Sequence, residues 1–137
     1  MSVISTLLLD TNIVSFIFKR DSRAAAYAPL LQGNRLAISF MTAAELFQWA
    51  VARNWGTSRA QRLEQAIATY LIIPPDLDLC RVWGQLRAER QRIGKSIDSQ
   101  DAWIAATALH FTLPLVTHNP GHFQGIPGLD VRTVVTP

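Results

Sequence analysis

Four carboxylates of the sequence, those of Asp10, Glu45, Asp98 and Asp101, each stand at the end of a predicted strand or in the first turn of a predicted helix. Carboxylate oxygens are the ligands that Mg²⁺ and Mn²⁺ prefer in proteins, whereas Zn²⁺ favours nitrogen and sulfur. Carboxylates held close together raise one another's pKa, and a bound divalent cation relieves that repulsion. If these side chains meet, they are suited to bind Mg²⁺ or Mn²⁺.

Asp10 carries the most information, because it closes the apolar run Thr6–Leu9. A short continuous apolar run that ends on polar residues is typical of a strand buried on both faces of a parallel sheet. Ligands of such sheets bind just beyond the carboxyl ends of the strands. Asp10 is therefore placed where functional groups of α/β proteins gather.

The other polar residues reach the same edge of the sheet from helices or strands. In a doubly wound sheet the helices run antiparallel to the strands, so helix N-termini lie beside strand C-termini. We expect the following residues to project toward one edge: Asp10, Glu45, Asp98, Asp101, His118 and Asn119.

Each acid also has a purely structural interpretation. Asp10 could cap the helix that follows it, Thr42 and Glu45 form a capping box, and Asp98 with Asp101 imitates one. The helix dipole likewise favours acids at helix N-termini. Capping alone does not explain why at least three of the ten acids gather at one edge, so we favour a functional site.

Apolar strands and amphipathic helices alternate along the chain, which predicts a parallel sheet of four to five strands with helices on both faces. The expected strands are 6–9, 36–40, 71–73, 115–117 and, at an edge, 131–134. The expected helices are 12–19, 22–32, 42–54, 58–70, an amphipathic one over 79–93, and a central buried one over 101–110.

Composition indicates one domain spanning residues 1–137. Charged residues make up only 17% and hydrophobic residues 49%, which favours a surface partly covered in a homodimer or by a partner. The net charge of +3 and a pI near 9.6 favour anionic partners such as nucleic acid. The single Cys80 excludes an internal disulfide and a cysteine zinc cluster. No signal peptide or membrane span is expected, so the predicted location is cytoplasmic.

Five segments resemble the PIN-domain ribonucleases, and specifically the VapC-type toxins of bacterial toxin–antitoxin pairs. They occur in the family's order and spacing and cover the whole chain. The segments are Leu8–Asn12, Thr42–Leu46, Asp101–Leu109, Leu115–Asn119 and His122–Leu129.

The resemblance implies a PIN-like three-layer α/β/α fold and Mg²⁺- or Mn²⁺-dependent cleavage of RNA. The family's three acids correspond to Asp10, Glu45 and Asp101, which would bind the metal. The fourth catalytic position corresponds to Asn119, where many relatives carry an acid. Asp98 is a further candidate ligand, and His122 stands where relatives often place an acid.

Neutral polar groups and a basic stretch are the expected contacts to RNA. Thr11, Asn12 and Thr117 could hydrogen-bond a phosphate without adding repulsion to the acids. A basic stretch leads directly into the acidic cluster, and its cations suit the RNA backbone, although a solvated helix face explains them as well. The stretch consists of Arg87, Arg90, Arg92 and Lys95.

Two rival functions remain from the sequence. A metal-dependent phosphatase would want a second acid where Asn12 stands and a lysine near the fourth strand, and the sequence has neither. A catalytically silent PIN-like module that binds RNA or protein is disfavoured by the complete set of acids. The expected partners are a cognate antitoxin, an RNA substrate with tRNA among the candidates, and a second copy of the chain.

Overall fold

The computed structural model describes residues 4–135, in which strands and helices alternate as the sequence predicts. The strands are β1 (Thr6–Leu9), β2 (Arg35–Ser39), β3 (Leu71–Ile73), β4 (Leu115–Val116) and β5 (Val131–Arg132). The helices are α1 (Thr11–Lys19), α2 (Ser22–Leu31), α3 (Phe40–Ala52), α4 (Thr57–Ala68), α5 (Leu77–Arg92), α6 (Ser99–Phe111) and the short 3-10 helix η1 (Pro120–Phe123).

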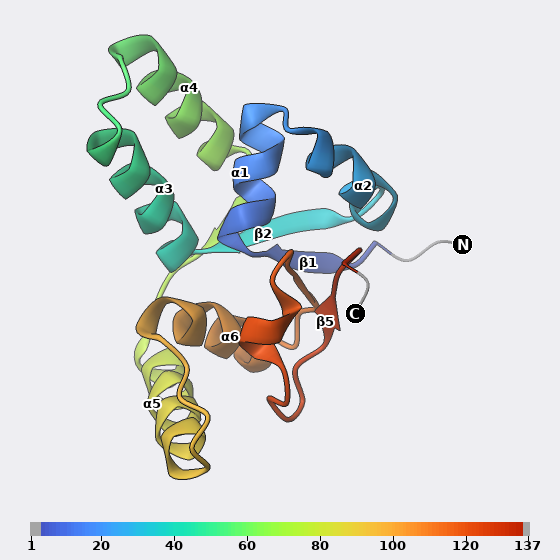
Figure 1. The fold of residues 1–137 in the computed structure, drawn as a ribbon, viewed down its shortest axis with the longest axis vertical. Helices are drawn as coiled ribbons and strands as arrows, with labels where there is room; N and C mark the ends of the chain where they lie inside the picture. Colours follow the sequence, from blue (N-terminus) through green and yellow to red (C-terminus); the bar gives the residue numbers. More distant parts are fainter. Residues whose placement is uncertain (1–3, 136–137) are drawn as a thin grey trace.

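The five strands form one sheet in the order β3-β2-β1-β4-β5, and every neighbouring pair is parallel. Helices α1 to α4 cover one face of this sheet, while α5 and α6 cover the other (Figure 1). The three-layer α/β/α fold with a central parallel sheet is therefore confirmed. Strand β5 lies at the edge, as predicted, but is shorter than the expected segment 131–134.

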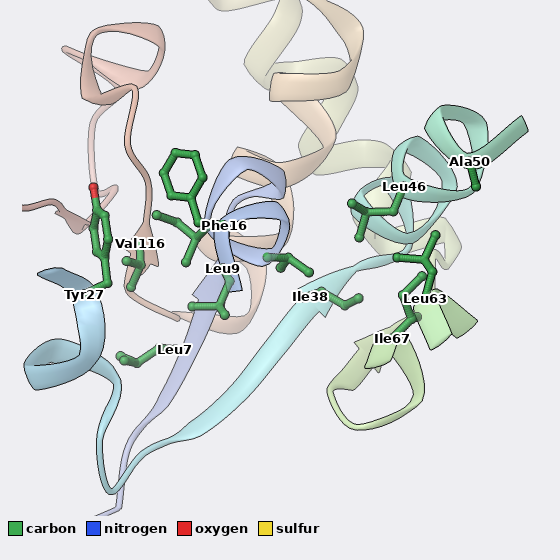
Figure 2. Close-up of a cluster of buried hydrophobic side chains, with 12 residues drawn as sticks. Leu7, Leu9, Phe16, Tyr27, Ile38, Leu46, Ala50, Leu63, Ile67 and Val116 are labelled. Carbon is green, nitrogen blue, oxygen red and sulfur yellow. The ribbon is translucent and has the colours of Figure 1, made fainter. Parts of the chain in front are cut away.

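Strand β1 lies at the centre of the sheet and contributes to two hydrophobic cores. Leu7 and Leu9 face α1 to α4, where they pack with Ile38 and Val116 (Figure 2). Leu8 faces the opposite side and packs with residues of α5 and α6. All three leucines are fully buried, which explains why this strand has an unbroken apolar sequence.

Helix α6 is the central buried helix that the sequence predicts. It lies against the sheet, with α5 packed on its outer side (Figure 1). Alanines at positions 102, 105, 106 and 108 are fully or almost fully buried, so the helix backbone approaches the sheet closely. Asp101 lies in the first turn of α6, directly before this buried segment, and therefore projects from a rigid support.

Helix α3 begins two residues earlier than predicted. Ser39 is its N-cap, because the Ser39 hydroxyl accepts a hydrogen bond of 3.1 Å from the Met41 amide. The capping-box interpretation of Thr42 and Glu45 is therefore wrong. Both residues lie inside the helix, where Thr42 is fully buried and Glu45 is free to serve another purpose.

Candidate active site

Asp10 is held at the junction of β1 and α1 by hydrogen bonds to both of its carboxylate oxygens. Oδ1 accepts from the Thr11 amide at 2.8 Å, so Asp10 does cap α1. Oδ2 accepts from the Thr117 hydroxyl at 2.7 Å. Burial raises the pKa of Asp10, although these two hydrogen bonds partly oppose the shift. The result is a buried, rigidly oriented carboxylate that is costly to charge.

Glu45 reaches the same edge of the sheet from α3. Its Oε1 accepts a hydrogen bond of 3.0 Å from the hydroxyl of Thr11, which lies 3.0 Å from the Thr42 hydroxyl. Burial is the largest cause that raises the pKa of Glu45, and the charges of Asp10 and Asp101 raise it further. Glu45 is thus coupled electrostatically to acids on two other elements.

Asp98 and Asp101 begin helix α6. The Asp98 side chain is its N-cap and accepts from the Asp101 amide at 2.8 Å, so the predicted cap is confirmed. Burial raises the pKa of Asp101 to about 6, and the charges of Asp98 and Asp10 contribute to the shift. His122 of η1 partly opposes it, because its Nδ1 lies 3.1 Å from Asp101 Oδ2.

The segment after β4 closes the site beside Asp10. The Thr117 hydroxyl, besides donating to Asp10, accepts from the Asn119 amide at 3.0 Å. Asn12 uses its side-chain oxygen to accept from the His118 amide at 3.3 Å, which ties the start of α1 to this segment. His118 is fixed from its other side by the Tyr27 hydroxyl, 2.6 Å from Nδ1. Thr117, Asn119 and Asn12 therefore lie around the end of β1.

The four acids interact electrostatically, and their carboxylates offer the oxygen ligands that a hard divalent cation prefers. Each of Asp10, Glu45 and Asp101 has its pKa raised partly by the charge of at least one other acid. Oxygen ligands of this kind fit Mg²⁺ or Mn²⁺. Among residues 4–135, no three acidic, histidine or cysteine side chains are already gathered as a metal site. The acids therefore suit a divalent cation by their donor atoms and their charge. They are not assembled around one point, because Asp101 is paired with His122.

The basic stretch is divided by the structure into two pairs. Arg90 and Lys95 line a cavity of about 570 Å³ together with Asp98, Asp101 and His122. Arg90 is 7% exposed and donates to the Gln124 carbonyl at 3.2 Å, which supports the loop after η1.

The remaining two arginines make other contacts. The Arg87 guanidinium lies 5.3 Å from the Trp83 ring centroid and donates to the Ile97 carbonyl at 3.3 Å. Arg92 is exposed and pairs with Glu89 on the same helix. Neither lines the cavity beside the acids.

Comparison with known proteins identifies the family to which this fold and site belong. The PIN domain family matches residues 7–128, a segment that contains all four acids and Asn119. The chain belongs to the PIN-domain family. Since the matched segment runs from β1 to the loop before β5, the resemblance inferred from the sequence is confirmed.

Several relatives of this PIN domain are VapC proteins. It is 31% identical over 124 residues to Ribonuclease VapC1 of Haemophilus influenzae strain R2866, covering 89% of this chain and 92% of the relative. It is 33% identical over 114 residues to Ribonuclease VapC5 of Mycobacterium tuberculosis, covering 82% of each chain. The VapC-type resemblance is thereby confirmed.

Solved structures of toxin–antitoxin complexes share the fold. VapBC2 of Rickettsia felis, bound to a DNA fragment from its promoter, superposes with a TM-score of 0.80 at 27% identity, covering 93% of this chain and 98% of that one. A toxin–antitoxin complex of Klebsiella pneumoniae gives a TM-score of 0.75 at 32% identity, covering 96% and 99%.

Two features of this PIN domain were missed from the sequence. Thr42 was interpreted only as a cap, but its buried hydroxyl pairs with the Thr11 hydroxyl, which in turn donates to Glu45. In the sequence, the only indication of this role was that Thr42 stands three residues before Glu45. A capping box has the same spacing, so the two roles could not be distinguished. The contact between His122 and Asp101 had no local signal, because it joins η1 to α6 across a loop.

Proposed function

We propose that this PIN domain is a Mg²⁺-dependent endoribonuclease of the VapC type, which acts as the toxin of a toxin–antitoxin pair. The observation that carries the proposal is that β1, α3 and α6 bring Asp10, Glu45 and Asp101 to one edge of the sheet. There the charges of Asp10 and Asp101 raise the pKa of Glu45, and the charge of Asp10 raises the pKa of Asp101. The relatives named ribonuclease VapC support the same activity.

Asp10, Glu45 and Asp101 are the proposed ligands of Mg²⁺ or Mn²⁺, with Asp98 at the border of the site. When bound, the ion would lower the pKa of a water and screen the charge of the attacked phosphate. The chain itself holds the carboxylates in place. Thr117 orients Asp10, while Thr11 orients Glu45, so that these two acids are preorganised by hydroxyl groups rather than by other charges.

The proposed reaction is in-line hydrolysis of an RNA phosphodiester. A bond forms between the water oxygen and phosphorus as the bond from phosphorus to the 3′ oxygen breaks. The leaving 3′ oxygen takes a proton and becomes a hydroxyl, and the other product carries a 5′ phosphate. The mechanism needs no covalent nucleophile from the protein. Asn119, beside Thr117, is a proposed hydrogen-bond partner of the reacting phosphate or water.

Substrate binding is proposed for the neutral and basic groups around the acids. Thr11, Asn12 and Thr117 border Asp10, and Lys95 shares a cavity with Asp98 and Asp101. A cation beside these acids would offset their repulsion of an RNA phosphate. Of the other basic residues, Arg90 supports the cavity wall, and Arg87 and Arg92 are proposed only as more distant contacts.

The proposed partners are a cognate antitoxin and a second copy of the chain. Solved structures that share this fold include VapBC2 of Rickettsia felis and a toxin–antitoxin complex of Klebsiella pneumoniae. Exposed apolar side chains support the proposal that a partner covers part of the surface. The residues, all at least 41% exposed, are Phe47, Val51, Leu71, Ile72 and Leu77. Within residues 4–135 no helix is long and apolar enough to cross a membrane. We propose that the chain acts in the cytoplasm as a single domain.

Expression with and without the antitoxin tests the biological part of this proposal. The chain alone should arrest growth and cleave cellular RNA, and co-expression of the antitoxin encoded beside it should restore growth. Sequencing of RNA 5′ ends after induction would identify the cleaved RNA, with tRNA among the candidates. Harmless expression of a soluble, monomeric protein would contradict it.

A further inference from the structure

A groove of about 610 Å³ opens between α1 and α4, away from the cluster of acids. Figure 1 shows α1 standing beside the α3–α4 pair on one face of the sheet. The apolar lining of the groove consists of the almost fully buried Val14, Leu63 and Ile67 and of the half-buried Ile17, Phe18 and Tyr70. This α1–α4 groove therefore offers a hydrophobic surface.

The rim of the α1–α4 groove is basic. Lys19 and Arg20 contribute from the end of α1, and Arg59 and Arg62 from α4, while no carboxylate is among the described residues that line the groove. Within the described chain none of these four cations forms an ion pair. Burial lowers the pKa of Lys19, and repulsion by Arg53 and Arg59 lowers it further. Such crowding of like charges favours an anionic ligand.

Aromatic rings beside the groove hold two of its four cations, Arg59 and Lys19, and the neighbouring Arg53. The Arg59 guanidinium lies 3.9 Å from the Trp55 ring centroid. The cations of Arg53 and Lys19 lie 5.1 Å and 5.9 Å from the centroid of Trp49. An arginine that stacks on a ring keeps its N–H groups free for phosphate oxygens.

We propose that the α1–α4 groove binds a single-stranded segment of the RNA substrate, remote from the bond that is cleaved. The proposal rests on the proposed ribonuclease function and extends it. The apolar lining would take a base, and the rim cations would take the phosphates on either side. Helix α1 links the two regions, because Asp10 caps its start and Lys19 ends it, about 13.5 Å of helix apart. An RNA strand in the active site can follow α1 into the groove.

Charge reversal on α4 tests the proposal. Arg59→Glu with Arg62→Glu changes two exposed residues of the groove and none near the acids. The matched control, Arg81→Glu with Arg132→Glu, makes the same change of charge on α5 and β5, where each arginine pairs with an aspartate. Circular dichroism and thermal melting establish that both variants fold.

Binding is measured by fluorescence anisotropy in EDTA, so that no cleavage occurs. The probes are a labelled oligouridylate of about 20 nucleotides, longer than the roughly 4–16 nucleotides that one such surface covers, and one of about 4. The unmodified protein should bind the longer probe more tightly. The α4 variant should lose about tenfold in affinity for it and reduce the salt slope by at least about 1.4, for two phosphate contacts. The control should retain both.

The proposal is overturned if the two variants lose affinity equally, if the salt slope of the α4 variant is unchanged, or if both probes bind alike. Failure of the unmodified protein to bind either probe also overturns it, in favour of a polypeptide occupant. Because the measurement requires no cleavage, a protein without nuclease activity would still give a clear result. The two proposals can therefore fail separately.

Discussion

The Thr117 hydroxyl donates a hydrogen bond of 2.7 Å to Oδ2 of Asp10, and joins residues that lie 107 positions apart in the sequence. The same carboxylate accepts from the Thr11 amide through Oδ1 and so caps α1. Capping and function are therefore not alternatives at Asp10. The Thr11 amide fixes one carboxylate oxygen and the Thr117 hydroxyl fixes the other. The remaining lone pairs of both oxygens therefore point in defined directions.

Thr117→Val should lower RNA cleavage about 10- to 100-fold, because loss of a hydrogen bond to a metal ligand has typically that effect. Valine keeps the shape of threonine but leaves the buried Asp10 without this donor, at a cost of about 1–3 kcal/mol in stability. Thr107→Val is the matched control, since Thr107 is equally buried and donates only to the Trp103 carbonyl. Equal loss of cleavage in both variants would show a merely structural effect.

Thr42→Val should also reduce cleavage, by about tenfold, although Thr42 contacts no acid directly. A hydroxyl has one proton, and Thr11 gives its proton to Glu45, so the Thr42 hydroxyl is the donor in the Thr11–Thr42 pair. Without that donor Thr11 is less constrained. Thr42→Ser restores the hydroxyl and should restore cleavage measured as kcat; failure of this rescue would refute the positioning role.

Asp98→Asn should retain much of the activity, because asparagine caps helices about as well as aspartate. Asp98→Ala should lower the free energy of unfolding by about 1 kcal/mol through loss of the bond to the Asp101 amide. Urea unfolding and RNA cleavage, measured on both variants, separate capping from metal binding. If Asp98→Asn is as inactive as Asp101→Asn, then Asp98 is a true ligand.

Asp101→Asn should abolish cleavage but stabilise the metal-free protein at pH 8. The pKa of Asp101 is raised from 3.8 to about 6, so the folded state holds this proton more tightly than the unfolded chain. Its stabilising effect is complete below about pH 4 and is lost as the pH rises through about 6. Removing the charge should therefore raise the Tm in EDTA at pH 8 and not at pH 4.

The control for this experiment is Asp78→Asn, on the exposed surface of α5. Its Tm difference from the unmodified protein should be small at both values of pH. In addition, Mg²⁺ should raise the Tm of the unmodified protein at pH 8 more than that of Asp101→Asn. A Tm gain for Asp101→Asn that is larger at pH 4 would have the wrong sign and would contradict the account.

The fold could be predicted because its central elements carry strong local signals. β1 is a nearly continuous apolar run and α6 is apolar nearly all round, and the chain direction then places Asp10 and Asp101 at one edge. The predicted start of α3 was wrong, because Ser39 and Thr42 are both residue types that cap helices well. The structure shows that the Ser39 hydroxyl is the one that accepts from a first-turn amide, that of Met41. Contacts between elements depend on side-chain register, which local sequence does not encode.

The basic stretch shows the same limit. Its four cations are close in sequence, yet the arginines lie on different sides of α5. Arg92 is exposed and pairs with Glu89, whereas Arg90 is buried and donates to the Gln124 carbonyl. Lys95, beyond the end of the helix, alone combines exposure with a place beside the acids. Which members of such a run face a site depends on the rotation of the helix, and that rotation is set by packing against α6.

Cleavage of RNA by purified Asp10→Asn, measured with Mg²⁺ or Mn²⁺ and with excess EDTA, tests whether this protein is a metal-dependent ribonuclease. Asparagine removes the charge, keeps the shape and can still accept from the Thr11 amide, so the variant should fold. Asp10→Asn should neither cleave RNA nor bind the metal, and the unmodified protein should cleave only with metal present. Cleavage by Asp10→Asn at the unmodified rate, or full activity of the unmodified protein in EDTA, would contradict the proposed function.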